Sequence, residues 1–123
     1  MTVRRFVVPI TVNASGDATA YTPAIYGSLL SIRYVKTDYA NGVTFVVTTE
    51  TTAETIWSEA AVNASATRYP RAATHSTAGA AALYAAGGTA VNGRIAIAGD
   101  RIKIVVSLGG NATTGTLHFT IDG

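Results

Sequence analysis

The chain has 123 residues, a length typical of a single domain, and it contains no cysteine. Charged residues make up 13% of it, about half the share usual in globular proteins, and the formal net charge is +2. This composition excludes disulfides and thiolate metal sites, and so small and scattered a positive excess argues against a nucleic-acid-binding patch.

The first segment, residues 3–12, alternates apolar residues with a period of two, which predicts a β-strand. Phe6, Val8, Ile10 and Val12 share one of its sides. Pro9 has no N–H to donate, so we expect an edge strand or a bulge. The apolar stretch before Pro9 is too short for a signal peptide, and the chain contains no apolar run long enough to span a membrane.

The next strands show the same period. Leu30, Ile32 and Tyr34 share one side of a second strand, and Val43, Phe45 and Val47 share one side of a third. Asn41-Gly42 lies between these strands and predicts a tight hairpin. A turn over residues 48–55 then leads into a short strand at residues 55–60.

The middle of the chain, residues 61–91, has no clear period. Residues 78–86 are rich in alanine and are followed by Gly87-Gly88, which favours either two turns of helix or a long ordered loop. Loops of this length in compact domains are often binding or assembly elements.

Alternation returns in the last third. Ala98-Gly99-Asp100 predicts a tight turn, and apolar positions then recur every second residue. They are Ile102, Ile104, Val106 and Leu108 on one strand, and Leu117, Phe119 and Ile121 on the last. We therefore expect an all-β fold: residues 1–123 form a single antiparallel, jelly-roll-like β-sandwich of about seven to eight strands, with an Ala/Gly-rich loop or short helix in the middle.

The sequence offers little for catalysis. His75 and His118 are the only histidines, and no Gly-x-Ser-x-Gly elbow is present. Glu50, Glu54 and Glu59 lie near Trp57, but nothing selects a glycosidase pair among them, and the aspartates fall in turns or at the terminus. We expect neither an enzyme nor a bound metal or cofactor.

Aromatic and arginine side chains are the better candidates for function. Arg68-Tyr69-Pro70-Arg71 places an aromatic ring between two cations, and tyrosine, tryptophan and arginine are enriched at protein interfaces. Tyr34 is expected in the core. The predicted protein-interface residues are Arg4, Arg5, Trp57, Arg68, Tyr69, Arg71 and Tyr84.

Several stretches of the chain resemble a family of small proteins encoded among the head and neck genes of tailed bacteriophages. The resemblance is carried by residues 31–34, by residues 68–71 with the Ala/Gly-rich segment after them, and by residues 97–106 and 109–119. It implies a virion structural protein: a capsid decoration or minor capsid subunit, or a head–tail junction component. The family has no catalytic signature, so no residue role follows from it.

The sequence and this resemblance together predict a decoration (cement) or minor capsid protein that binds the outside of the capsid shell and is made in the host bacterial cytoplasm. The expected partners are the major capsid protein and copies of the chain itself, a trimer being one possibility, without nucleic acid or membrane. Two alternatives stay open: a carbohydrate-binding module that adheres to a host surface glycan, and a neck or tail component.

Overall fold

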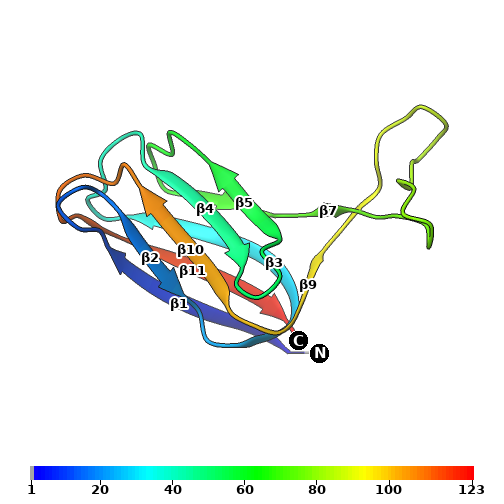
Figure 1. Ribbon diagram of the computed structural model, residues 1–123, viewed down its shortest axis with the longest axis horizontal. Helices are drawn as coiled ribbons and strands as arrows, with labels where there is room; N and C mark the ends of the chain where they lie inside the picture. Colours follow the sequence, from blue (N-terminus) through cyan, green and yellow to red (C-terminus); the bar gives the residue numbers. More distant parts are fainter. Residues whose placement is uncertain (1) are drawn as a thin grey trace.

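The computed structural model describes residues 2–123, and these contain strands and turns but no helix. Two antiparallel sheets pack face to face and form a β-sandwich, as predicted (Figure 1). Consequently, no described segment is a helix of the length and hydrophobicity needed to cross a membrane. The chain passes repeatedly from one sheet to the other, so most turns join strands that do not pair.

The first sheet, called sheet A, has five strands. Its order is β1 (Val3–Thr11), β11 (Thr114–Asp122) and β3 (Ile25–Lys36), followed by two short strands on the far edge of β3, namely β6 (Ala66–Arg68) and β9 (Ile95–Asp100). β9 pairs with residues 25–29 of β3, and β6 pairs with residues 32–34. The edge of sheet A is therefore covered in two pieces.

The second sheet, called sheet B, has four strands in the order β2 (Ala18–Tyr21), β10 (Ile102–Ser107), β4 (Thr44–Thr49) and β5 (Thr55–Glu59). The two sheets hold five and four strands, slightly more than the seven to eight expected, because two short strands share one edge. Pro9 lies on edge strand β1, as its missing N–H requires.

The core lies between the sheets and is formed by the inward positions of each strand. Tyr34, Phe45 and Phe119 are its largest fully enclosed side chains. Phe45 contacts both the Tyr34 ring, at a centroid distance of 4.8 Å, and the Trp57 ring, at 5.2 Å. These contacts join β3 of sheet A to β4 and β5 of sheet B.

One predicted alternation is wrong in β3. The register between β3 and β11 shifts at Thr120/Ile121, so that Ser31 pairs with Thr120 whereas Leu29 pairs with Ile121. Leu30 has no partner in this register, and Leu29, rather than Leu30, is buried. A β-bulge inserts one residue and so reverses the side-chain alternation beyond it.

At two predicted tight turns a glycine has positive φ, as expected, but the chain does not form the predicted local structure there. Gly42 has φ +91°, yet the segment around it joins β3 of sheet A to β4 of sheet B and is not a hairpin. Gly99, with φ +68°, lies inside β9, just before the chain enters sheet B as β10. Leu108 was expected inside a strand, but β10 ends at Ser107 and Leu108 is exposed.

Candidate interaction surface

Residues 69–94 leave the sandwich as a projection, called here the arm. It includes two short paired strands, β7 (Ala72–Ala73) and β8 (Asn92–Gly93), and it extends away from both sheets (Figure 1). Of the two alternatives predicted for residues 78–86, a short helix or a loop, the structure has the loop, with turns.

Hydrogen bonds within the arm connect the two sides of its outer part. Ala82 lies at its centre: its N–H donates to the Thr74 carbonyl at 2.9 Å, and its carbonyl accepts from the Val91 N–H at 2.9 Å. Ser76 and Ala80 close one turn, and further bonds close a second turn at Gly87-Gly88. Every hydrogen bond found for residues 72–92 has its partner within the arm.

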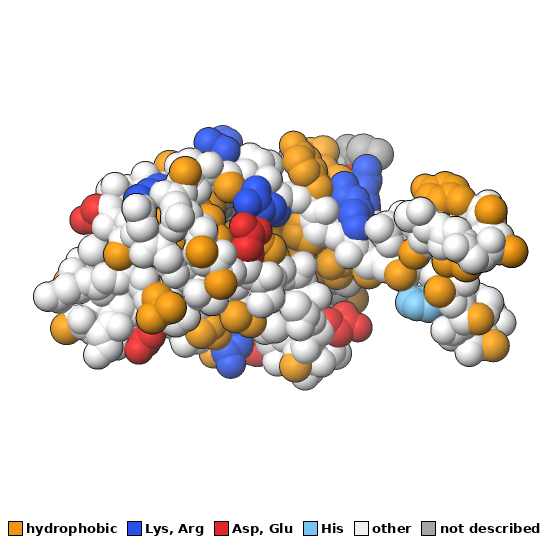
Figure 2. All heavy atoms as spheres, turned by 90° about the horizontal axis from the view of Figure 1, so that it is seen from above, with side chains coloured by type: hydrophobic (Ala, Val, Ile, Leu, Met, Phe, Trp, Pro, Cys, Tyr) orange, Lys and Arg blue, Asp and Glu red, His pale blue; other side chains and the backbone are white. Residues whose placement is uncertain are grey.

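The arm has almost no interior. Nearly all its side chains are exposed, including Tyr69 at 66%, Leu83 at 42% and Tyr84 at 76%. Between Arg71 and Arg94 its sequence contains no Asp, Glu, Lys or Arg. Figure 2 shows the result: hydrophobic and polar side chains and one histidine cover the projection, and cations gather where it meets the sandwich.

The base of the arm lies where the edge of β3 is uncovered between β9 and β6. The Arg71 guanidinium donates to the Leu30 carbonyl at 3.1 Å and to the Pro70 carbonyl at 2.8 Å. On the returning side, Arg94 forms an ion pair with Asp122 at 2.8 Å. Arg71 thus satisfies a carbonyl at the bulge, and both ends of the arm are tied to sheet A.

A third contact closes the sandwich next to the arm. The Glu59 carboxylate on β5 accepts from Nε and Nη2 of Arg68 on β6, at 2.8 and 2.9 Å, and from the Trp57 indole N–H at 3.1 Å. The hydrogen bonds from Arg68 are the main cause that lowers the pKa of Glu59 from its ordinary value of 4.5 to about 2. This contact links the edges of sheets B and A.

The structure corrects the prediction that Trp57 lies at an interface. Only 8% of the residue is exposed, and its ring stacks on Phe45 with an interplanar angle of 18°. The bulge in the β4–β5 pairing at Val47/Thr48 accompanies two consecutive buried residues on β5, Ile56 and Trp57. Trp57 is therefore a core residue.

The other predicted interface residues are on the surface but do not form one cluster. Arg4 and Arg5 are exposed on β1, and neither forms an ion pair with residues 2–123. Arg68 is engaged by Glu59. Tyr69 and Arg71 lie at the base of the arm, and Tyr84 lies in its outer part. Leu83, next to Tyr84, is also exposed there but was not among the predicted interface residues.

The outer faces of the two sheets differ in charge. On sheet A, the register places Val7, His118 and Arg33 side by side, with Arg5 further along β1. Arg33 donates to Thr67 at 3.1 Å, and Asp122, the one carboxylate on the outward positions of β1, β11 and β3, is paired with Arg94. Sheet A therefore presents a cationic outer face.

On sheet B, the outward positions are almost all uncharged. Lys103 is the one charged side chain among the outward positions of β2, β10, β4 and β5. The others are Thr19, Tyr21, Thr44, Val46, Thr48, Thr55, Ser58, Val105 and Ser107. This neutral surface is called the sheet B face below.

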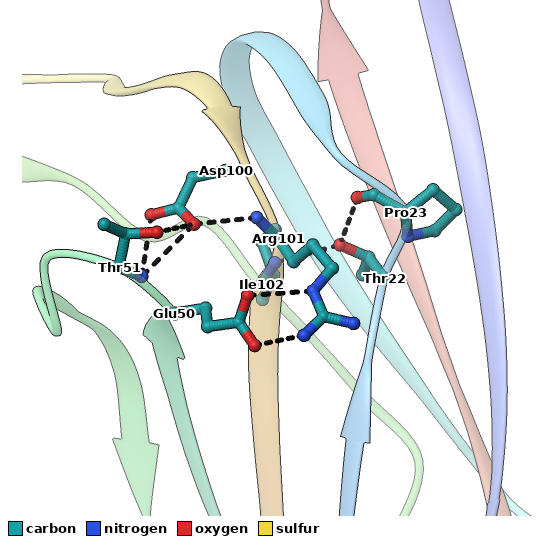
Figure 3. A network of polar contacts seen from close by, with 7 residues as sticks. All are labelled: Thr22, Pro23, Glu50, Thr51, Asp100, Arg101 and Ile102. Atoms are coloured by element: carbon teal, nitrogen blue, oxygen red, sulfur yellow. Dashed lines mark hydrogen bonds and ion pairs between the residues drawn. The ribbon is translucent and has the colours of Figure 1, made fainter.

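A polar network at one end of the sandwich contains the remaining clustered carboxylates (Figure 3). Asp100 accepts from the Thr51 N–H and hydroxyl, the latter at 2.9 Å, and Glu50 forms a two-pronged ion pair with Arg101. The Arg101 guanidinium also lies 4.3 Å from the centre of the Tyr21 ring. Both carboxylates are engaged, and their contacts connect the β9–β10 junction with the β4–β5 turn.

Within residues 2–123 there is no pocket, and no group of three potential ligand side chains is placed to hold a metal ion.

No protein-family model matches the chain, and a search of curated proteins found no match.

Proposed function

We propose that the protein is a structural component of a bacteriophage virion, a decoration or minor capsid protein that binds the outside of the shell. The observation that carries this proposal is the arm, which has exposed Leu83 and Tyr84 and no charged residue between Arg71 and Arg94. An uncharged projection without a core of its own gains most from contact with a neighbouring subunit, which is the requirement of an assembly protein.

Two further observations support the proposal. The resemblance to head and neck proteins of tailed phages covers the base of the arm at residues 68–71. The cationic outer face of sheet A, with Arg5 and Arg33 free of ion pairs to the described chain, suits a capsid surface rich in carboxylates. Many copies on one shell make weak single contacts sufficient.

The test is co-sedimentation with purified empty capsids of the phage that encodes the chain. We expect saturable binding, which Arg5→Glu combined with Arg33→Glu weakens at least tenfold. The control Lys103→Glu reverses one cation on the sheet B face, so it is compared with Arg5→Glu alone, and it should bind like the wild type. Absence of the chain from purified particles by mass spectrometry, together with no binding to shells, would refute the proposal.

Glycan binding is the alternative that the exposed tyrosines favour. Tyr26, Tyr69 and Tyr84 expose 71%, 66% and 76% of their surface, and sugars stack on such rings, although Trp57 is enclosed in the core. Calorimetric titration with host surface polysaccharide separates the two functions: saturable heat that Tyr84→Ala abolishes, with no binding to shells, would favour adhesion. Localisation of the chain's density in particle images distinguishes the shell from the neck or tail.

A further inference from the structure

The arm cannot complete its own structure. Its strands β7 and β8 pair over only two residues each, and a two-stranded ribbon is marginally stable in water. The accessible surface of the chain is 6624 Å², above the roughly 6,200 Å² expected for a compact monomer of 12.6 kDa. The outer part of the arm, with Leu83 and Tyr84, is thus surface without a cover.

The arm also cannot reach the sandwich from which it grows. It leaves the edge of β3 and extends away from both sheets, and residues 72–92 form no hydrogen bond to the sandwich (Figures 1 and 2). A surface that covers it must therefore belong to another molecule.

The chemistry of the arm selects which surface of a second copy would fit. Docking an uncharged arm on sheet A would remove water from Arg5 and Arg33 and give them no counter-charge, which is costly. The centre of the sheet B face offers Val46, Val105 and threonine hydroxyls, and Lys103 is the one charged side chain among the outward positions of its strands. At the Tyr21 end of this face, the charge of Arg101 is already balanced by its ion pair with Glu50. This face matches the arm with the smallest loss of solvation.

We propose that the arm of one copy docks on the sheet B face of a second copy, with Tyr84 and Leu83 against Val46 and Val105. Each chain then donates one arm and accepts one. Such head-to-tail contacts close into a ring when the rotation permits and otherwise continue as an array. The inference deepens the proposed function, since it names the partner of the arm, but it concerns self-association and can be tested without capsids.

The natural absence of cysteine permits a direct test. Tyr84→Cys is mixed with a size-tagged chain that carries Val46→Cys, and the mixture is oxidised mildly. The control partner carries Val7→Cys, on the outer face of sheet A, where Val7 is 52% exposed. We expect the mixed disulfide with Val46→Cys at least tenfold faster than with Val7→Cys.

Equal or faster cross-linking of Tyr84→Cys to Val7→Cys would refute the proposed docking on the sheet B face. So would a reaction in which Tyr84→Cys forms disulfides only with other Tyr84→Cys chains. Sedimentation velocity of the cysteine-free chain gives a second readout. Tyr84→Asp and Val46→Asp should each weaken association at least tenfold, and Val7→Asp should not. A wild-type chain that stays monomeric up to about 1 mM would refute self-association by the arm. Cross-linking without capsid binding would remove the proposed function and leave this inference intact.

Discussion

Trp57→Ala tests the assignment of this residue to the core. A tryptophan side chain buries about 150–250 Å², worth roughly 4–6 kcal/mol at about 25 cal/mol per Å². Truncations of buried tryptophan cost about 3–5 kcal/mol, and the loss of stacking on Phe45 at 5.2 Å belongs to that range. We therefore expect the free energy of unfolding to fall by about 4 kcal/mol, a large part of the 5–15 kcal/mol typical of a domain.

Urea unfolding followed by far-ultraviolet circular dichroism is the suitable assay, since Trp57 is the single tryptophan and its removal leaves no indole fluorescence. Trp57→Phe is the matched control: it keeps the stacking on Phe45, loses the hydrogen bond to Glu59, and should cost about 1–2 kcal/mol. A Trp57→Ala chain within about 1 kcal/mol of the wild type, but defective in assembly, would contradict the core assignment.

Three further predictions concern the closure of the sandwich and its aromatic core. Because the Glu59 pKa is lowered from 4.5 to about 2, its contact with Arg68 stabilises the fold above pH 4.5 and is lost as the pH falls toward 2. Since both side chains are about one-third or more exposed, we expect a loss of about 1 kcal/mol or less, absent in Glu59→Gln, by urea unfolding at about pH 6 and pH 3. Gly115→Ala should lower the free energy of unfolding by about 1–3 kcal/mol, because the new Cβ would lie 2.5 Å from the Tyr39 ring. This loss should be smaller in a Tyr39→Ala background, and additive losses would argue against the clash. Tyr34→Phe should be neutral or stabilising, because the Tyr34 hydroxyl is buried without a hydrogen-bond partner in the described chain. Tyr39→Phe loses a 2.7 Å hydrogen bond to a β1 carbonyl and should lower the free energy of unfolding by about 1–2 kcal/mol. Thermal melts in which Tyr34→Phe is the less stable of the two variants would contradict this account.

Much of the fold could be predicted from period-two alternation, because each strand of a sandwich buries one face. Val8 and Ile10 on β1, Ile104 and Val106 on β10, and Phe119 on β11 are buried as expected. The β1–β11 and β10–β4 pairings are regular, so alternation along these strands identifies the buried positions correctly.

The errors lie where a single residue or a long-range pairing decides. Leu30 is apolar and lies two residues before Ile32, so alternation predicts that it is buried. The bulge makes Leu29 the buried residue instead. Asn41-Gly42 does turn the chain, but local turn chemistry is the same whether the next strand pairs with the last one or crosses to the other sheet. Pairing partners are set by distant segments, which alternation alone does not identify.

The candidate surface was predictable only in part. The lack of period over residues 61–91 indicated an irregular element, and Tyr84 was correctly placed outside the core. The projection of the arm was not predictable, because it depends on β6 and β9 sharing one edge of β3. The engagement of Arg68 by Glu59 was missed for a similar reason: the two residues lie on different sheets.

The split edge also explains how an arm without a core can coexist with a well-packed sandwich. β9 and β6 cover the edge of β3 on either side of the bulge, so the chain between them can leave with little loss of pairing. Arg71 engages the Leu30 carbonyl at the gap, and the ion pair of Arg94 with Asp122 fixes the return. Short edge strands with a cation between them also resist uncontrolled edge-to-edge pairing, which a long uncovered β3 would invite. Because these contacts all lie at or below the base, the sandwich places no packing requirement on the outer arm, whose side chains are free to suit a partner.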